Sequence, residues 1–488
     1  MSAGEAVTQP DPVPRSTTAI LAVLAYTGIT ASLMQTLVVP LLGGLPRILN
    51  ADPGDTTWVV TITLLAAAVA TPVAGRLGDM YGKRRMMIAS TVPLFLGSIT
   101  CALAGSLVPM IIGRGLQGLG VGVIPLGIAL LRDVMPPERL GTAIALISSS
   151  LGIGGALGLP LASAVTEYSN WRVMFWAAAA LVAIATVLIV IVVPEGSAEG
   201  PSGRFDVPGA ILLGAGLISL LLPVSKGAAW GWDSALTLGF FASSAALLLI
   251  WGWWELRAGE PLVDLRVTAR PQVLVTNIAS AAIGVGMYSL QLSVPQLLQL
   301  PTSLGYGLGQ SMLAMGLWMA PGGIMMMLLS PVGAKLSAAR GPKVTLVTGA
   351  VIMAAGYCSA LVLMGSTWGL LMVTIICTSG VAFAYGAMPA LIMGAVPQSE
   401  TAAANSFNTL MRSIGTSISA AVIGAVLAQL TISAGGHAVP SEAGFRVAFL
   451  IGGGVSILAA VIAAAIPYRR SVIRQGPVRE EQPAVAAS

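Results

Sequence analysis

Fourteen long apolar segments constrain what this chain can fold into. The hydrocarbon core of a bilayer is about 30 Å thick, so a helix that rises about 1.5 Å per residue needs about 20 apolar residues to cross it. Of the 488 residues, 56% are hydrophobic and only 9% are charged. This composition predicts an all-α integral membrane protein. The expected spans lie roughly at 17–42, 56–74, 86–105, 107–131, 140–166, 172–193, 207–225, 234–254, 272–298, 309–333, 343–364, 367–392, 402–431 and 443–466.

The cations between these segments predict the orientation of the chain. With the N-terminus inside, 18 of the 24 Lys and Arg residues fall on the inner side, 4 fall outside, and Arg114 and Arg412 lie within spans. Because Lys and Arg accumulate in cytoplasmic loops, both termini are expected in the cytoplasm. The first sixteen residues carry acids and three prolines without a basic lead-in, so we expect no cleaved signal peptide.

Two pairs of similar segments predict a duplicated architecture. VPLLGGLPRIL at 39–49 resembles VPQLLQLPTSL at 294–304, an offset of 255 residues, and PVAGRLGDMYGKR at 72–84 resembles PVGAKLSAARGPK at 331–343, an offset of 259. Parallel six-helix repeats with a site between them near the membrane midplane are one architecture of secondary transporters. The expected parts are a tail at 1–16, a bundle at 17–193, two inserted helices at 207–254, a bundle at 272–466 and a tail at 467–488, with both tails cytoplasmic.

The charged segment GRLGDMYGKRR separates the second and third spans, where we expect a loop with glycines in its turn. It resembles the signature loop of the major facilitator superfamily. The matching residues are Gly75, Leu77, Asp79, Gly82, Lys83, Arg84 and Arg85. The resemblance implies that Asp79 clamps the two halves on the cytoplasmic side, favours the outward-open state, and reaches the start of the thirteenth span near 399–401. A phosphate-binding loop is excluded because the first glycine and the Ser or Thr after the Lys are missing.

Two further motifs resemble those of the same superfamily. Arg114, Gln117 and Gly118 match its fourth-helix motif, which is linked to proton coupling, and a cation inside the membrane is functional by default. Gly154, Gly158 and Pro160 resemble its fifth-helix motif of exporters, although Ala162 and Ser163 replace the usual glycines. Glycines in apolar helices permit close helix packing, so the formal GxGxxG of the fourth span predicts no dinucleotide site.

The resemblance extends over essentially the whole chain and is to the fourteen-helix drug:proton antiporter branch. It implies a major facilitator fold in the bacterial cytoplasmic membrane and export of lipophilic drugs or antibiotics in exchange for protons by alternating access. A solute importer of the same fold and an exporter of one endogenous metabolite stay open as alternatives. The spans hold no paired acids, His cluster or nucleophile with a base, so we expect no enzyme and no metal site.

The expected partners follow from the same features. They are membrane lipid, protons and a small lipophilic substrate; the proton gradient replaces any cofactor, and the chain is expected to act as a monomer. Cations spread over short loops are typical of a membrane protein rather than of a nucleic-acid binder.

The polar and flexible side chains inside the spans are the candidates for a substrate pocket. Every acid lies in a loop, a tail or the last turn of a helix, with Glu167 and Glu255 closest to the membrane. Burying a cationic drug without a carboxylate is costly, so we expect neutral, zwitterionic or weakly acidic lipophilic substrates and poor export of dications. Met312, Met315 and Met319 follow a helical spacing that suits either a lipophilic site or helix packing. The candidates are Gln35, Asn277, Gln291, Met312, Met315, Trp318, Met319, Asn405 and Arg412.

Overall fold

Fourteen membrane-spanning helices make up most of the chain. The computed structural model describes residues 17–38, 41, 45–51, 53–56, 58–195, 204–434 and 437–467. In these residues, fourteen helices are long and apolar enough to cross a membrane, as predicted. Backbone polar groups in hydrocarbon must pair within the protein, and a helix achieves this within a single segment. The expected tail at 1–16 and residues 468–488 of the other tail lie outside the described residues.

The first six spans precede the inserted pair. They are α1 (Thr17–Thr36), α4 (Trp58–Tyr81), α5 (Lys83–Leu103), α6 with α7 (Leu107–Leu119 and Val123–Val134), α8 (Pro137–Tyr168) and α9 (Arg172–Val192). The fourth span is divided between α6 and α7 by a 3₁₀ turn at Gly120–Gly122. A Cβ on Gly120 would lie 2.5 Å from the carbonyl oxygen of Ser90 on α5, so this turn is a point of close helix approach.

The inserted pair and the last six spans follow. They are α10 (Val207–Trp230), α11 (Ala235–Glu255), α13 (Pro271–Gln299), α14 (Met312–Arg340), α15 (Pro342–Leu363), α16 (Thr367–Met393), α17 (Thr401–Gln429) and α18 (Glu442–Ala464). Ser311, Ser366 and Ser441 cap α14, α16 and α18 by accepting a backbone N–H of the first turn. These caps explain why the helices begin where they do.

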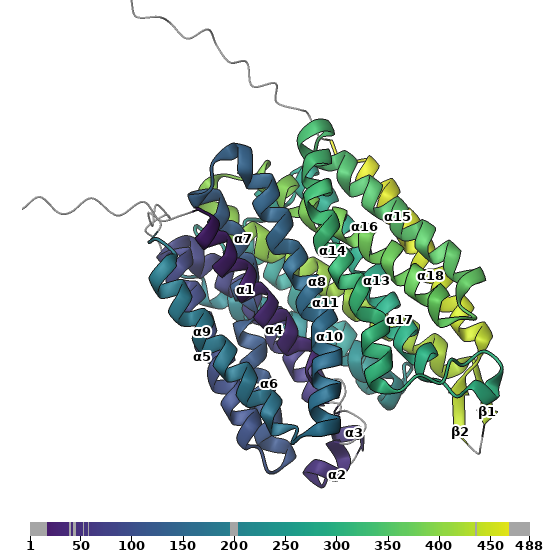
Figure 1. Cartoon of the computed structure of the whole chain (residues 1–488). Coiled ribbons are helices and arrows are strands. Elements are labelled where there is room, and N and C mark those ends of the chain that lie inside the picture. The colour runs from purple at the N-terminus through teal and green to yellow at the C-terminus, as the bar shows by residue number, and fades with distance from the viewer. Residues whose placement is uncertain are drawn as a thin grey trace, which may run out of the picture.

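The short elements lie between the spans. They are α2 (Leu45–Leu49), α3 (Pro53–Thr56), α12 (Leu265–Thr268) and the antiparallel pair β1 (Thr431–Ala434) and β2 (His437–Pro440), in which Thr431 lies opposite Pro440. Figure 1 shows α2, α3 and both strands at one end of the helices. Because successive spans alternate in direction, Thr17 and Ala464 lie at the opposite end, which also holds the end of α4. We call this the Asp79 end.

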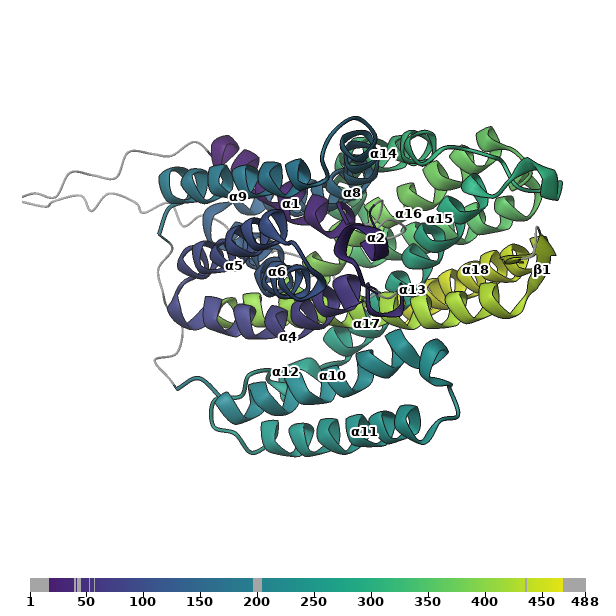
Figure 2. The ribbon, with the colours of Figure 1, turned by 90° about the horizontal axis from the view of Figure 1, so that it is seen from below.

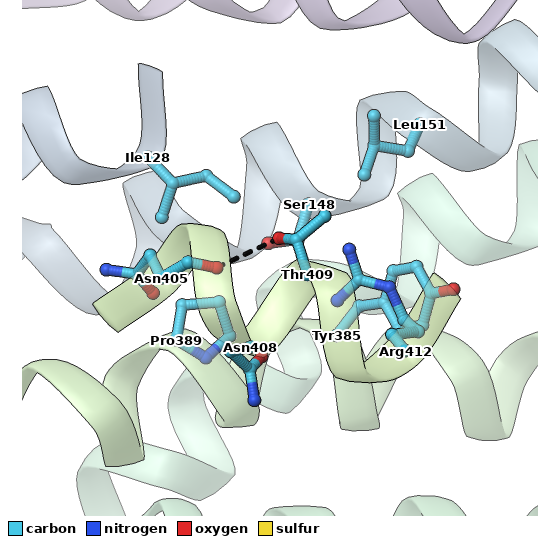
Figure 3. Close-up of a pocket in the computed structure, with 9 residues that line it drawn as sticks. All are labelled: Ile128, Ser148, Leu151, Tyr385, Pro389, Asn405, Asn408, Thr409 and Arg412. Carbon is cyan, nitrogen blue, oxygen red and sulfur yellow. Dashed lines mark hydrogen bonds between the residues drawn. The ribbon is translucent and has the colours of Figure 1, made fainter. Parts of the chain in front are cut away.

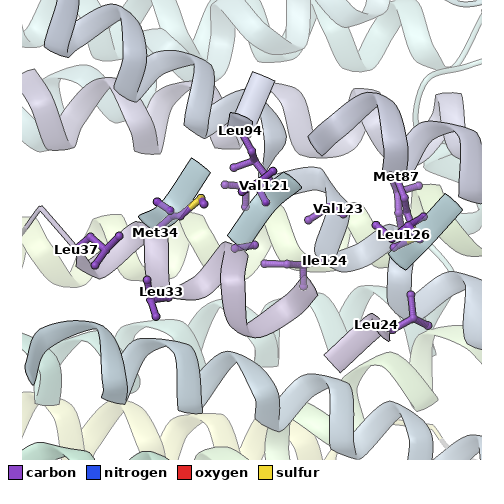
Figure 4. Close-up of a cluster of buried hydrophobic side chains, with 14 of the residues drawn as sticks. Leu24, Leu33, Met34, Leu37, Met87, Leu94, Val121, Val123, Ile124 and Leu126 are labelled. Atoms are coloured by element: carbon purple, nitrogen blue, oxygen red, sulfur yellow. The ribbon is translucent and has the colours of Figure 1, made fainter. Parts of the chain in front are cut away.

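Separate apolar cores hold the parts together. Figure 4 shows the core of the first half, where Leu24 and Met34 of α1 lie among residues of α5 and α7 such as Met87 and Leu126. The inserted α10 and α11 form a separate layer beneath the other helices in Figure 2. Leu217 of α10 packs in one cluster with Leu65 of α4 and Leu410 of α17. The insert therefore touches both halves.

The two halves meet along two helix pairs. On one side α8 packs against α14, and on the other α4 packs against α17; α7 and α16 also reach across. Helices that bring backbones close in a membrane do so through small residues, and glycines lie at both contacts. The candidate site is therefore built between α4, α7, α8, α16 and α17.

Candidate functional site

The segment that resembles the signature loop is mostly helical. Its residues through Tyr81 complete α4, and Lys83 already begins α5. Only Gly82 stands between the two helices, with φ at +97°, a value that favours glycine. The predicted loop over Gly75–Arg85 is therefore wrong except at this one residue. The helices continue past the apolar run because a helical backbone keeps its hydrogen bonds beyond the membrane edge. Hydropathy marks that edge and does not predict where a helix ends.

Asp79 of α4 holds the first turn of α17. Its Oδ1 accepts the backbone N–H of Ala402 at 3.1 Å, and its Oδ2 accepts that of Ala403 at 2.8 Å. The first N–H groups of a helix lack partners within the helix and carry partial positive charge, so a carboxylate is stabilised there. Asp79 is only 5% exposed. Water therefore competes little with this contact between the two halves.

The contact lies slightly beyond the position expected from the resemblance. The expected partners were residues near 399–401, whereas the donors are Ala402 and Ala403. Residues Gln398–Glu400 form a 3₁₀ turn, and the α-helix begins only at Thr401. The free N–H groups that point out of the helix therefore belong to the second and third helical residues.

Gly75 lets α4 approach α17 closely. A Cβ at this position would lie 2.6 Å from Cβ of Ser406 and 2.7 Å from the carbonyl oxygen of Ala402. A Cβ on Gly78 would meet Leu126 of α7. Leu77, between them, is half-buried. The two glycines thus act by the space that they leave, and not by a turn as the sequence suggested.

A polar network surrounds the Asp79 contact. Lys83 Nζ lies 2.7 Å from Oδ2 of Asp133 and 3.9 Å from Oδ1 of Asp79. Asp133 Oδ1 in turn accepts from Nε2 of Gln398 at 3.1 Å. Arg132 donates to Oγ1 of Thr401 at 2.7 Å. These bonds join the end of α7 to the start of α5, to Gln398 and to the first residue of α17.

Sequence reasoning missed Arg132 and Asp133. In the sequence, Arg132 is one of the cations expected on the inner side. A signal for them exists in the sequence: an Arg and an Asp stand side by side at the end of the fourth span. The bias of cations toward the inner side predicts the Arg but not the acid next to it.

The remaining cations of the motif point elsewhere. Arg84 pairs with Glu195 at 2.9 Å, with the Glu195 side chain 65% exposed, and donates to the carbonyl oxygen of Val190. Arg85 is exposed. Exposed ion pairs contribute little to stability, so Arg84 holds α5 to α9 only weakly.

Arg114 is buried inside the first half. It is 1% exposed and donates to three oxygens: the carbonyls of Val59 at 3.2 Å and Met34 at 3.0 Å, and Oε1 of Gln117 at 2.7 Å. Gln117 donates onward to Ser98 of α5 at 2.9 Å. A Cβ on Gly118 would lie 2.5 Å from the carbonyl oxygen of Thr63, so it too is a packing position. The motif therefore joins α1, α4, α5 and α6, and no acid of the described part of the chain bonds to Arg114.

The fifth-helix motif lies against two helices. A Cβ on Gly154 would lie 2.7 Å from Cβ of Ser32, and one on Gly158 would meet Thr36, so both glycines pack on α1. Pro160 instead faces α14, where a Cβ on Gly316 would lie 2.9 Å from its nitrogen. The side chain of Glu167, near the end of this helix, lies outside what the structure describes.

A small cavity lies between the halves (Figure 3). Its volume is about 10 Å³, which is enough for about one water molecule. Arg412 lies with its guanidinium carbon 4.5 Å from the ring centre of Tyr385. The lining residues come from α7, α8, α16 and α17 and are Ile128, Ser148, Leu151, Tyr385, Pro389, Asn405, Asn408, Thr409 and Arg412.

The structure separates the pocket candidates into groups. Asn405 and Arg412 line the cavity, and Asn277 lies behind it, accepting from Nδ2 of Asn408 at 2.8 Å. Gln35 and Gln291 are exposed at the surface of α1 and α13.

The methionine stripe of α14 does not reach this cavity. Met315 is buried in a core of the second half and Met319 packs against that core, whereas Met312 is 38% exposed. Trp318 lies edge-on to Trp368, with ring centres 5.0 Å apart, and donates to Gln310. Of the two alternatives for this stripe, the structure favours helix packing.

Comparison with known proteins agrees with these features. A family model described as Major Facilitator Superfamily matches residues 24–420 and 300–488. A multidrug resistance protein B homolog of Mycobacterium tuberculosis is 30% identical over 337 residues, which cover 67% of this chain and 61% of the relative. The tetracenomycin C resistance and export protein of Streptomyces glaucescens is 32% identical over 218 residues, 44% of this chain and 40% of the relative. The chain thus spans less than two thirds of the length of these relatives.

Solved structures share the fold at low sequence identity. The human organic anion transporter MFSD10 aligns with a TM-score of 0.64 and 16% identity, over 91% of this chain and 99% of that one. The proton:xylose symporter XylE aligns with a TM-score of 0.65 and 14% identity, over 92% and 96%. These likenesses show the fold alone. Together with the family match over most of its length, they identify the chain as a member of the major facilitator superfamily, whose fold is that of membrane transporters and not of enzymes.

Proposed function

We propose that the chain exports lipophilic drugs or antibiotics from the bacterial cytoplasm in exchange for protons. The observation that carries the proposal is the double hydrogen bond from the start of α17 to Asp79 of α4. It joins the halves at one end, as a transporter closed on that side requires. Relatives named for multidrug resistance and for tetracenomycin C export support the direction of transport.

One helix connects the closed end to the cavity. Ala402 and Ala403, at the start of α17, bond to Asp79, and Asn405, Asn408 and Arg412 on the following turns face the cavity. A movement of α17 that breaks the Asp79 contact therefore also changes the cavity. This coupling is what alternating access demands: the substrate site opens to one side only when the other is closed.

Protonation of Asp79 offers a way to drive that movement. A neutral carboxyl group holds helical N–H groups less strongly than a carboxylate does, because charge-assisted hydrogen bonds are roughly twice as strong. The charged groups nearest to Asp79 are Lys83, at 3.9 Å, and Arg76. In our proposal, a proton that reaches Asp79 weakens the contact and opens this end. Arg114, which is bonded to carbonyl and amide oxygens, keeps the first half rigid during the change.

The proposal also includes the orientation of the transporter, its membrane, its partners and its energy source. The Asp79 end faces the cytoplasm together with both termini, and the chain lies in the cytoplasmic membrane. It acts as a monomer whose partners are lipid, protons and substrate, with the proton gradient as its energy source and no cofactor.

Transport into inverted membrane vesicles tests the proposal. The chain is expressed in a bacterium that lacks its main efflux pumps, and uptake of tetracenomycin C and of uncharged lipophilic antibiotics is measured with and without respiratory energy. We expect energised vesicles to accumulate at least one compound above vesicles without the chain, and a protonophore to abolish the difference. Equal uptake in energised and de-energised vesicles would exclude active export. Proton-driven uptake into right-side-out vesicles would identify an importer instead.

A further inference from the structure

The cavity between the halves holds a cation, Arg412, that has no ion-pair or hydrogen-bond partner among the described residues. Arg412 is half-buried, and within the described part of the chain it makes no ion pair and no hydrogen bond. Its one polar contact is with the ring face of Tyr385, whose hydroxyl points away to Met287 of α13. Arg114 is the opposite case, since all three of its bonds end on oxygens of the first half. Five N–H donors of Arg412 are therefore available to a ligand.

Two more polar groups in the cavity lack partners. Oγ of Ser148 on α8 and Oδ1 of Asn405 on α17 are buried without a hydrogen bond, and the two residues are 2% and 3% exposed. Buried polar atoms without partners are uncommon and call for an explanation. Ser148 offers a hydroxyl donor and Asn405 an amide acceptor, on opposite sides of the interface between the halves.

The position of the cavity suits a transported ligand. Arg412 lies eleven residues after Thr401, so it is about 16 Å along α17 from its start. Because α17 has 29 residues, Arg412 lies well away from both of its ends. With a volume of about 10 Å³ the cavity is too small for a drug-sized molecule, whose sites measure about 300–1,000 Å³. A substrate therefore reaches these groups only when the halves separate at this level.

The charges favour an anion over a cation. None of the residues that line the cavity is an acid, and the ion-paired acids of the described chain, such as Asp79 and Asp133, lie at the ends of helices. An unpaired guanidinium in a site away from water repels a cationic ligand, whereas it binds a carboxylate or phenolate through short, charge-assisted hydrogen bonds. Ile128, Leu151 and Pro389 supply an apolar wall beside it.

We propose that Arg412 is the anion-binding residue of the substrate site, and that the exported compounds are lipophilic carboxylates or phenolates. The ionised group lies on Arg412 with the Ser148 hydroxyl beside it, a neighbouring hydroxyl of the substrate donates to Asn405, and the apolar body lies against Leu151 and Pro389. This inference names the substrate class of the proposed exporter and rests on that function.

A matched pair of ligands tests the site directly. 1-Pyrenebutyrate and its methyl ester share one apolar body and differ in charge, and the binding of each to the purified full-length protein is measured by fluorescence. We expect wild type to bind the carboxylate about tenfold or more tightly than the ester, as hydrogen bonds to charged groups predict. Arg412→Gln should reduce this preference to within about twofold by weakening carboxylate binding more than ester binding, and Arg412→Lys should keep most of it.

The outcomes separate the site from the function. Ester binding shows that each variant is folded, so a preference that persists in Arg412→Gln, or that is absent in wild type, overturns the anion site. Ser148→Ala should lower carboxylate affinity alone. If vesicles export uncharged antibiotics although the purified protein shows no preference for the carboxylate, the anion site is wrong and the exporter stands. If the preference is present but energised vesicles export nothing, the failure lies with the proposed function.

Discussion

Oδ2 of Asp79 lies 2.8 Å from the backbone nitrogen of Ala403, although 324 residues separate them in the chain. The first residue belongs to the first half and the second to the other. Charge-assisted hydrogen bonds to helix N–H groups rank among the stronger polar contacts, and this pair is shielded from water. The contact therefore defines the state in which the structure is found, with the halves joined at the Asp79 end.

Gly75→Ala should impair this contact by size alone. The added methyl would overlap Ser406 and the carbonyl oxygen of Ala402, and overpacking costs about 1–3 kcal/mol. We expect transport to fall about tenfold with unchanged protein levels. Gly424→Ala on α17 is the matched control, because a Cβ there meets nothing within 4 Å. Equal transport by the two variants would show that close approach at Gly75 is unimportant.

Asp133→Asn should have a smaller effect than loss of Asp79. The Asp133 side chain is 18% exposed, and partly exposed ion pairs contribute about 0.2–1 kcal/mol. Transport is expected to fall by no more than about fivefold. If Asp133→Asn abolishes transport while Asp79→Asn spares it, then Lys83 and Asp133, and not the helix N-terminus, hold the halves together.

Gln117→Leu should destabilise the protein without changing which compounds it exports. Leucine leaves Arg114 and Ser98 without the amide that joins them, at a cost of about 1–3 kcal/mol for buried groups that lose their partner. The unfolding midpoint in detergent measures the loss. Gln35→Leu provides the control at an exposed glutamine. A similar shift of the unfolding midpoint in both variants would show that the buried hydrogen bonds of Gln117 do not stabilise the protein.

A reporter fused after Ser488 tests the orientation. The bias of Lys and Arg toward one side predicts that an enzyme active only in the cytoplasm works at this position, whereas one active only in the periplasm does not. A second fusion within the Thr302–Leu304 turn, on the opposite side of α13, should give the reverse pattern. Periplasmic activity after Ser488 would contradict the proposed orientation.

The sequence was sufficient for the spans and for part of the site. Apolar length predicts every spanning helix because hydrocarbon allows the backbone few alternatives. Apolar length does not predict that the segment from Gly75 to Tyr81 is helical, because hydropathy marks the membrane edge and not the end of the helix. Asp79 was identified through the motif, but its partners at Ala402 and Ala403 depend on where α17 begins.

The cavity could be predicted only in part. Arg412 and Asn405 were found because polar side chains are rare in spans. Ser148 and Tyr385 carry no such signal, because serine and tyrosine are common in membrane helices. Met315 and Met319 showed a regular spacing that fits packing and binding equally well, and only the tertiary contacts distinguish the two.

The accessibility of position 406 reports whether Asp79 closes this end by holding α17. Ser406 is fully buried against Gly75. In a chain whose native cysteines are replaced by alanine, Ser406→Cys is labelled in inverted vesicles with a membrane-impermeant maleimide. We expect labelling to be about tenfold faster when Asp79→Asn is added, while Arg85→Cys, exposed at the same end, reacts at one rate in both backgrounds. Equal labelling of Ser406→Cys with and without Asp79 would show that Asp79 does not hold this end closed.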